Sequence, residues 1–199
     1  MEKKRSFKQL KKEKNAEELC NFCRKITEEY ANSEAQFARS YFSEHYNISE
    51  KCFYEVIKYA IETNLVEDVV VFKAMEKATQ NSEAHSKGSG GRCKANYEKM
   101  YMQKCKYEAM LIPAEGVKHA AIDFADNPDI TKQDIAASYG WNPKMFEIIL
   151  IRAIQDNIVD DATVEAIEKR SINNSKAEKK QIAVRFFLDL KKKREANKK

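Results

Sequence analysis

Apolar residues recur every three or four positions along most of the chain, and polar residues fill the positions between them. This spacing places the apolar side chains on one face of a helix. No segment alternates apolar and polar residues over the length of a strand, so we predict an all-α protein. In the second half of the chain the spacing predicts five helices: Ala114–Ala125, Lys132–Tyr139, Asn142–Asn157, Ala162–Ser171 and Lys176–Arg194.

The sequence also repeats itself. Residues 51–84 and 144–177 are identical at 11 of 34 positions when they are aligned with a shift of 93 residues. Upstream, a shift of 98 pairs Ala38 with Ala136 and gives the first copy five additional residues near 42–46. Two unrelated helical segments would not keep this order, so we predict tandem copies of one five-helix module. The predicted organisation is a basic N-terminal arm, residues 1–14, followed by modules at residues 15–110 and 112–199.

Several helix ends are marked by residues that favour them. Thr131, followed by Asp134, is typical of a helix N-terminal cap, and Gly140 can adopt the left-handed conformation that closes a helix. Asp161 is expected to cap the fourth helix of the second module, and Asp68 has the same place in the first module. These signals predict short turns between helices that pack against one another.

One segment of the second module, residues 133–154, has the sequence QDIAASYGWNPKMFEIILIRAI. In it a small residue, Ala136, is followed four positions later by Gly140, and apolar residues stand at Ile135, Trp141, Phe146 and Ile149. This pattern resembles a helix-turn-helix of the DNA-binding superfamily, in which the small residue lets two helices cross closely and the glycine forms the turn. The resemblance covers about 22 residues of each module and implies a trihelical fold within it.

The first module fits this motif less closely. It keeps Phe37, Ala38, Phe53 and Val56 at the matching positions, but its turn lacks the glycine and is expected to be longer. We therefore expect the second module to be the better example of the motif.

The resemblance implies that the second helix of the motif lies in the major groove of DNA, with side chains near its N-terminus at the base edges. Eight of the ten residues 145–154 are apolar, however, and a helix that is apolar nearly all round is normally buried. Groove binding and packing against another surface are therefore both open for this helix. The candidate DNA-contacting residues of the two motifs are Ser49, Lys51 and Lys58, and Asn142 and Lys144.

Positive charge is concentrated in three segments, although the net charge of the chain is only +5. Residues 1–14, 85–106 and 176–199 carry formal charges of +5, +5 and +7, so the remainder is acidic. Basic segments that are separated from acidic ones favour contact with a phosphate backbone. For the basic run at 191–194 alone, a solvated helix end is the simpler interpretation. The candidate phosphate contacts are Arg92, Lys94, Lys191, Lys192, Lys193 and Arg194.

Residue types that carry catalysis or bind metals form no recognisable site. Cys20 and Cys23 make a C-x-x-C pair, but it lies within a helical pattern and has no second pair at the spacing of a zinc site. The five cysteines, an odd number, fit a reducing cytoplasm better than a disulfide framework. No apolar run approaches the roughly 18 residues of a membrane span. We therefore expect a cytoplasmic protein that is not an enzyme and that needs no cofactor, metal or membrane.

The sequence favours a DNA-binding protein with tandem helix-turn-helix modules, a transcriptional or mobile-element regulator whose partner is double-stranded DNA. Two modules in one chain can cover two adjacent half-sites, and homodimerisation stays open. The alternative is a protein-binding adaptor or an inhibitor of a nucleic-acid-processing protein, of the anti-CRISPR type, because acidic surfaces can occupy a basic nucleic-acid channel. Structured RNA is a third candidate partner, through the basic helices.

Overall fold

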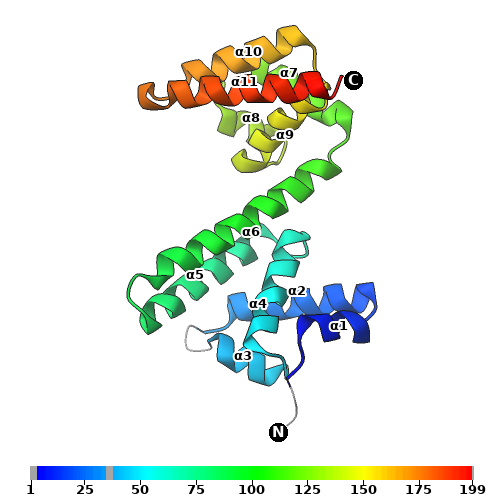
Figure 1. Cartoon of the computed structure of the whole chain (residues 1–199), viewed down its shortest axis with the longest axis vertical. Helices are drawn as coiled ribbons and strands as arrows, with labels where there is room; N and C mark the ends of the chain where they lie inside the picture. Colours follow the sequence, from blue (N-terminus) through cyan, green and yellow to red (C-terminus); the bar gives the residue numbers. More distant parts are fainter. Residues whose placement is uncertain (1–3, 35–37, 199) are drawn as a thin grey trace. The chain divides into compact units, whose positions relative to one another are not determined.

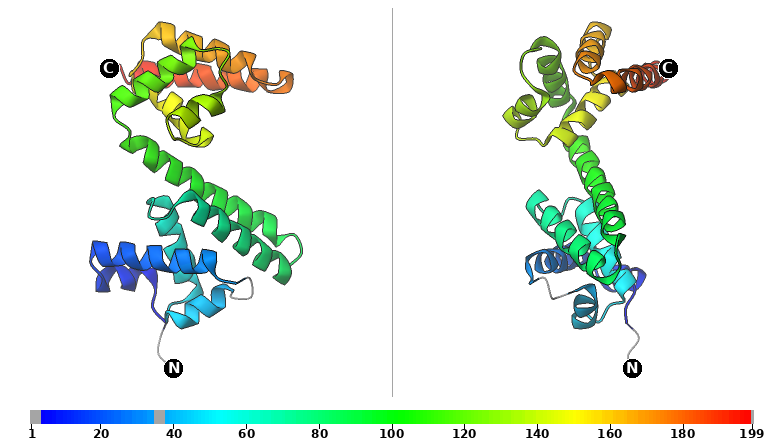
Figure 2. Two further views of the ribbon diagram at one scale, coloured as in Figure 1. Left: turned by 180° about the vertical axis from the view of Figure 1, so that it is seen from behind. Right: turned by 90° about the vertical axis from the view of Figure 1, so that its left-hand side faces the viewer.

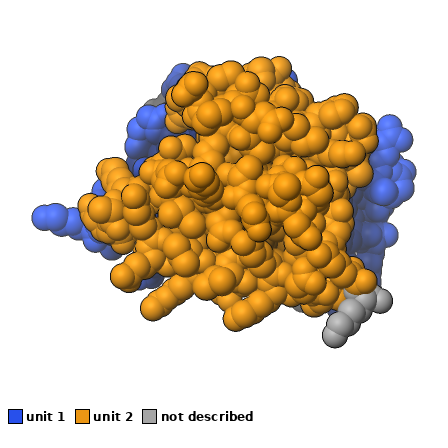
Figure 3. Space-filling view, turned by 90° about the horizontal axis from the view of Figure 1, so that it is seen from above, with its two compact units in different colours: residues 1–107 blue, residues 108–199 orange. Residues whose placement is uncertain are grey.

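The computed structural model describes residues 4–34 and 38–198. Within these residues the regular structure is helical, and only an isolated bridge between Arg5 and Ile48 has strand-type pairing. The prediction of an all-α protein is therefore confirmed. The chain divides into two compact units, residues 1–107 and 108–199 (Figure 3). The boundary between them lies inside one helix.

Each unit is built from a succession of helices joined by short connections (Figure 1). The first unit contains α1 (Phe7–Glu13), α2 (Ala16–Asn32), α3 (Arg39–His45), α4 (Glu50–Glu62), α5 (Asp68–His85) and most of α6 (Ser89–Leu111). The second contains α7 (Ala114–Asp126), α8 (Lys132–Ser138), α9 (Pro143–Gln155), α10 (Asp161–Asn173), the short 3-10 helix η1 (Ala177–Lys179) and α11 (Lys180–Ala196).

The core of the first unit forms where α2 packs against α4 and α5, and where α3 packs against α4. Tyr30, Phe42 and Phe53 meet there with ring centroids 5.2 to 5.9 Å apart. The basic N-terminal segment joins this core, because Leu10 of α1 is completely buried against α2 and α4. The apolar positions of the sequence thus account for the packing of this unit.

In the second unit α9 is central and contacts α7, α8 and α11. Figure 2 shows α10 and α11 lying side by side, and the two helices are in contact. Phe124 of α7 and Phe146 of α9 pack with their ring centroids 5.9 Å apart. The five helices predicted for this half of the chain are present, although α11 begins at Lys180, after the short η1.

Two of the predicted helix caps are wrong. The N-cap of α10 is Asp160, whose side chain accepts a hydrogen bond from the Thr163 backbone, and Asp161 is the first residue of the helix. The N-cap of α5 is Glu67, without a side-chain capping bond, and Asp68 follows it. A cap and the first helical residue are both favourable places for a carboxylate, so sequence alone did not separate them.

The buried positions of the two units follow the same order along the chain. The six buried residues of α4 precede the six of α9 by 93 positions, and the three of α5 precede the three of α10 by 93. Each of the four buried residues of α7 has a buried counterpart in α2, at a distance of 94 positions. Each of the three buried residues of α11 has a buried counterpart in α6, at a distance of 90 positions. Asn64 and Asn157, also 93 apart, have positive φ angles of 56° and 57°.

A buried cation on α5 and another on α10 follow the same correspondence. Lys77 of α5 is 6% exposed and donates to the Ser33 carbonyl at 3.1 Å. Arg170 of α10, 93 positions later and 7% exposed, donates to the carbonyls of Phe124 and Ile130. Burial lowers the pKa of both groups. Each cation therefore supplies hydrogen bonds that the carbonyls at the end of α2 or α7 would otherwise lack.

Candidate nucleic-acid interface

The predicted motif corresponds to α3 and α4 in the first unit and to α8 and α9 in the second. The first helix of each pair has seven residues and the second has 13. Four residues connect them in both units, so the longer turn predicted for the first module is wrong. The second residue of each turn has positive φ, 49° at Asn47 and 69° at Gly140. Asparagine is the residue that most readily replaces glycine in this conformation. A turn defined by glycine alone therefore does not include the one at Asn47.

The first helices of the two motifs also carry small buried residues at equivalent positions. Ala136 of α8 is completely buried, as predicted, and Ser43 of α3, 93 positions earlier, is 1% exposed. The predicted pairing of Ala38 with Ala136 is wrong, because Ala38 is the N-cap of α3 and lies outside the helix. Phe37, another residue that the sequence matched to the motif, lies outside the described residues. A single shift of 93 therefore relates both motifs without an insertion.

Ser49 and Asn142 act as N-caps of α4 and α9. The Ser49 hydroxyl accepts from the Cys52 backbone at 3.1 Å, and the Asn142 side chain accepts from the Met145 backbone at 2.8 Å. Both residues are half-buried. The capping oxygens are already used, so these side chains are less available to a ligand than the sequence indicated.

The outer faces of α4 and α9 carry mixed charge. Lys51 and Lys58 are exposed on α4, and Lys58 lies 3.9 Å from Glu62. On α9 Lys144 is exposed, and Glu147 pairs with Lys132 of α8. Neither face has the concentration of Arg and Lys that a purely electrostatic interface would require.

The apolar composition of α9 is explained within its own unit. Its six buried residues form one face, which α7, α8 and α11 cover. Arg152 is held by the carbonyls of Ala109 and Ile112, at 2.8 and 2.7 Å. The face that carries Lys144 and Glu147 is exposed. The helix α9 is therefore buried on one side and exposed to solvent on the other.

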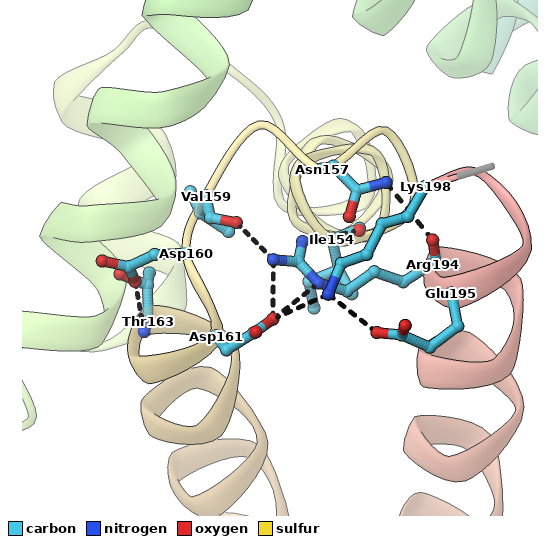
Figure 4. Close-up of polar contacts among 9 residues, drawn as sticks. All are labelled: Ile154, Asn157, Val159, Asp160, Asp161, Thr163, Arg194, Glu195 and Lys198. Carbon is cyan, nitrogen blue, oxygen red and sulfur yellow. Dashed lines mark hydrogen bonds and ion pairs between the residues drawn. The ribbon is translucent and has the colours of Figure 1, made fainter.

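The C-terminal basic run does not form one surface. Arg194 is 4% exposed, and its guanidinium is used inside the unit (Figure 4). Lys191 pairs with Glu168, and Lys192 lies 3.8 Å from Asp189. Lys193 is exposed. Of these four candidates, Lys192 and Lys193 are the most accessible.

The middle basic segment is divided in the same way. Arg92 and Lys94 are exposed near the start of α6. Lys104, in the same segment, is 3% exposed and lies 2.7 Å from Asp68 of α5. Because Lys104 and Arg194 are buried, the exposed surface of these two basic segments is less positive than the sequence predicted.

The N-terminal segment is held against the motif of the first unit. The Arg5 backbone donates to the Asn47 carbonyl at 3.2 Å, and its carbonyl accepts from the Ser49 backbone at 3.0 Å. The Arg5 side chain also donates to the Tyr46 carbonyl at 2.8 Å. These bonds place the start of the chain directly beside the turn of the motif.

One face of α1 is basic and exposed. Lys11 and Lys12 stand three and four positions after Lys8, so the three share a side of the helix that is away from the buried Leu10. Lys11 Nζ lies 5.6 Å from the ring centroid of Tyr59 on α4. The basic face therefore adjoins the second helix of the motif, an arrangement that charge counting could not reveal.

The described part of the chain has no group of three or more His, Cys, Asp or Glu side chains placed to hold a metal ion. Among these same residues, no helix combines the length and the apolar character needed to cross a membrane. Comparisons with family models, curated proteins and solved structures give no match.

Proposed function

We propose that the chain is a tandem pair of helix-turn-helix modules that binds double-stranded DNA as a regulator. The observation that carries this proposal is the shared geometry of α3–α4 and α8–α9. Both pairs have the same helix lengths, the same four-residue turn with positive φ at its second position, and a small buried residue at the equivalent position of the first helix. In DNA-binding proteins this arrangement presents the second helix to the major groove.

Within this proposal the contacts fall into two classes. Lys51 and Lys144 stand on the exposed sides of the two second helices and would reach base edges. Lys8 and Lys12 of α1 would contact phosphates beside the first motif. Lys192 and Lys193, near the C-terminal end of the second unit, would also contact phosphates. Arg194 has no such role, because its guanidinium is buried.

The test begins with binding of the full chain to random-sequence duplex DNA at two salt concentrations, followed by selection of preferred sites. The variant K8A/K12A should weaken binding to every sequence and reduce the salt slope by about 2, since each phosphate contact contributes about 0.9. The variant K51A/K144A should instead reduce discrimination between the selected site and random DNA by about 1 to 3 kcal/mol per lost contact.

Lys118 provides a matched control, because it is exposed on α7 outside the proposed contacts. K118A should bind as the unmodified chain does. Equal losses in K118A and K51A/K144A would mean that only general charge matters. Absence of DNA binding at low salt would reject the proposal.

A protein partner is the second candidate function. It is favoured by the large apolar residues exposed on α11, Ile182 at 67%, Leu188 at 51% and Phe186 at 45%. Exposed apolar side chains grouped on one helix are typical of interaction surfaces. This candidate requires a stoichiometric complex with a nucleic-acid-processing protein that persists at moderate salt, together with little affinity for free DNA.

A further inference from the structure

The second unit contains a cavity of about 450 Å³ that opens to the surface, since Glu147 and Phe186 in its lining are exposed. It is bounded by α7, α8, α9, α10 and α11 together with residues 174–175. This volume lies in the range of small-molecule sites, roughly 300 to 1,000 Å³. Most of the wall is apolar and is formed by Phe124, Leu150, Ile154, Ile167, Phe187 and Leu190.

The polar residues of the lining gather where α8 begins and α10 ends. Lys132 and Glu147 form an ion pair there, so their charges cancel. Ser171 lines the cavity near the end of α10, and Arg170 of this helix donates to the carbonyl of Ile130, two residues before Lys132. An uncharged hydrogen-bonding group fits this end better than an ion does, because the two charges there already pair with each other.

The first unit has tyrosines at two positions that correspond to the lining of this cavity. Tyr54 stands 93 positions before Glu147, and Tyr97 stands 90 positions before Phe187. Tyr97 is 5% exposed, and its pKa is raised by burial first and then by neighbours that include Tyr30 and Tyr54. Tyrosines therefore stand at the two positions that correspond to the cavity lining, where the second unit has a carboxylate and a phenyl ring.

We propose that this cavity binds a small aromatic molecule that is uncharged and carries one hydrogen-bonding group. The aromatic part lies against the apolar wall, and the polar group lies at the end formed by Lys132, Glu147 and Ser171. The molecule thereby supplies an aromatic ring where the second unit has Glu147 in place of the first unit's Tyr54. This site stands independently of DNA binding, although α8 and α9 of the second motif form part of its wall.

The probe is N-phenyl-1-naphthylamine, a neutral aromatic amine with one N–H that becomes fluorescent in apolar surroundings. Titration into the full chain, without DNA, should give saturable binding of one molecule per chain. A ligand of this size is expected to bind with a Kd on the order of 10 to 100 µM.

Two variants close the cavity in different ways. Glu147→Tyr introduces the ring that the first unit has at the corresponding position, and Ser171→Phe fills the polar end. Each should weaken probe binding at least tenfold while leaving the far-UV circular dichroism unchanged. Glu147→Gln, which removes the charge without adding a ring, should keep binding.

Leu188→Ser is the control for binding at the surface, because Leu188 is 51% exposed on α11 and does not line the cavity. This variant should bind the probe normally. The proposal is overturned by absence of saturable binding, or by binding that Leu188→Ser abolishes and Glu147→Tyr and Ser171→Phe retain. Failure of DNA binding would not change the probe result, so the two proposals fail separately.

Discussion

The guanidinium of Arg194 and the carboxylate of Asp161 are joined by hydrogen bonds from Nε at 3.0 Å and from Nη2 at 2.9 Å (Figure 4). The same guanidinium donates to the carbonyls of Ile154 at 3.1 Å and Val159 at 2.7 Å. In the first unit Lys104 and Asp68 form the corresponding pair, 2.7 Å apart, and Asp68 precedes Asp161 by 93 positions. In each unit a cation from the last helix therefore fixes the first turn of the preceding helix.

Replacing Arg194 should destabilise the second unit rather than change a DNA contact. Arg194→Ala leaves two carbonyls without their donors, so we expect the free energy of unfolding to fall by about 2 to 3 kcal/mol. Lys193→Ala, on the exposed side of the same helix, should change it by less than about 0.5 kcal/mol. Trp141 is the single tryptophan and lies in the second unit, so its fluorescence during urea denaturation measures this unit. Full stability of Arg194→Ala together with weaker DNA binding would contradict this role.

Acid should weaken the same unit through Asp161. Its pKa is lowered, first by the hydrogen bond from Arg194 and then by Lys198. A carboxyl whose pKa is lower in the folded state contributes stability above its unfolded pKa, about 3.9. That contribution is lost as the pH falls through the folded pKa. We therefore expect the free energy of unfolding to decline between about pH 5 and pH 2.

Asp161→Asn tests this origin. The variant should be less stable than the unmodified chain at neutral pH, and its stability should depend less on pH in the acid range. Lys198→Ala should keep most of the dependence, because Arg194 supplies the larger effect. Part of the decline should persist in both variants, since hydrogen bonds from Thr163 also lower the pKa of Asp160. Parallel acid curves for Asp161→Asn and the unmodified chain would refute this assignment.

Asn142 allows capping to be separated from base recognition. Its side chain accepts from the Met145 backbone at 2.8 Å, and serine can make the same bond. Asn142→Ala should lower the free energy of unfolding by about 1 kcal/mol, whereas Asn142→Ser should keep it. If the amide also reads a base, Asn142→Ser should lose about 1 to 3 kcal/mol of discrimination at one base pair. Unfolding curves and binding to point-mutated sites measure the two effects independently.

Local patterns were sufficient to predict the helices. Apolar spacing gave all five helices of the second half, and Thr131 and Gly140 marked true helix ends. Identity at a shift of 93 also indicated corresponding segments, because the same buried face is needed in α4 and α9. The failure occurred upstream, where α3 and α8 share burial but few identical residues. Buried volume and φ angle are maintained there by different residue types.

The candidate site could be predicted only in part, because it depends on long-range contacts. Lys51 and Lys144 are exposed, as groove contact would require. Arg194 and Lys104 belong to basic segments in which the position of each residue around the helix decides whether it is exposed. Only the packed fold shows that these two residues are buried. The hydrogen bonds between Arg5 and the turn of the first motif span more than 40 residues, and no local signal indicates them.

The turns of the two motifs provide the last test, because their positive φ angles should determine which residues are tolerated. No atom lies within 4 Å of the position that a Cβ on Gly140 would occupy, so Gly140→Ala meets no clash. It should still lower the free energy of unfolding by about 1 to 2 kcal/mol, because its φ of 69° is unfavourable for alanine.

In the first unit Asn47→Ala should lower stability in the same way, and Asn47→Gly should be neutral or stabilising. Gly91→Ala is the matched control, since Gly91 lies inside α6 with open space around it. That substitution should raise the free energy of unfolding by about 0.5 to 1 kcal/mol. Denaturation followed by circular dichroism compares all four variants. Equal responses at Asn47 and Gly140, opposite to Gly91, would mean that both turns obey one conformational requirement. Tolerance of alanine at Asn47 alone would show that the two motifs differ at the turn that defines them.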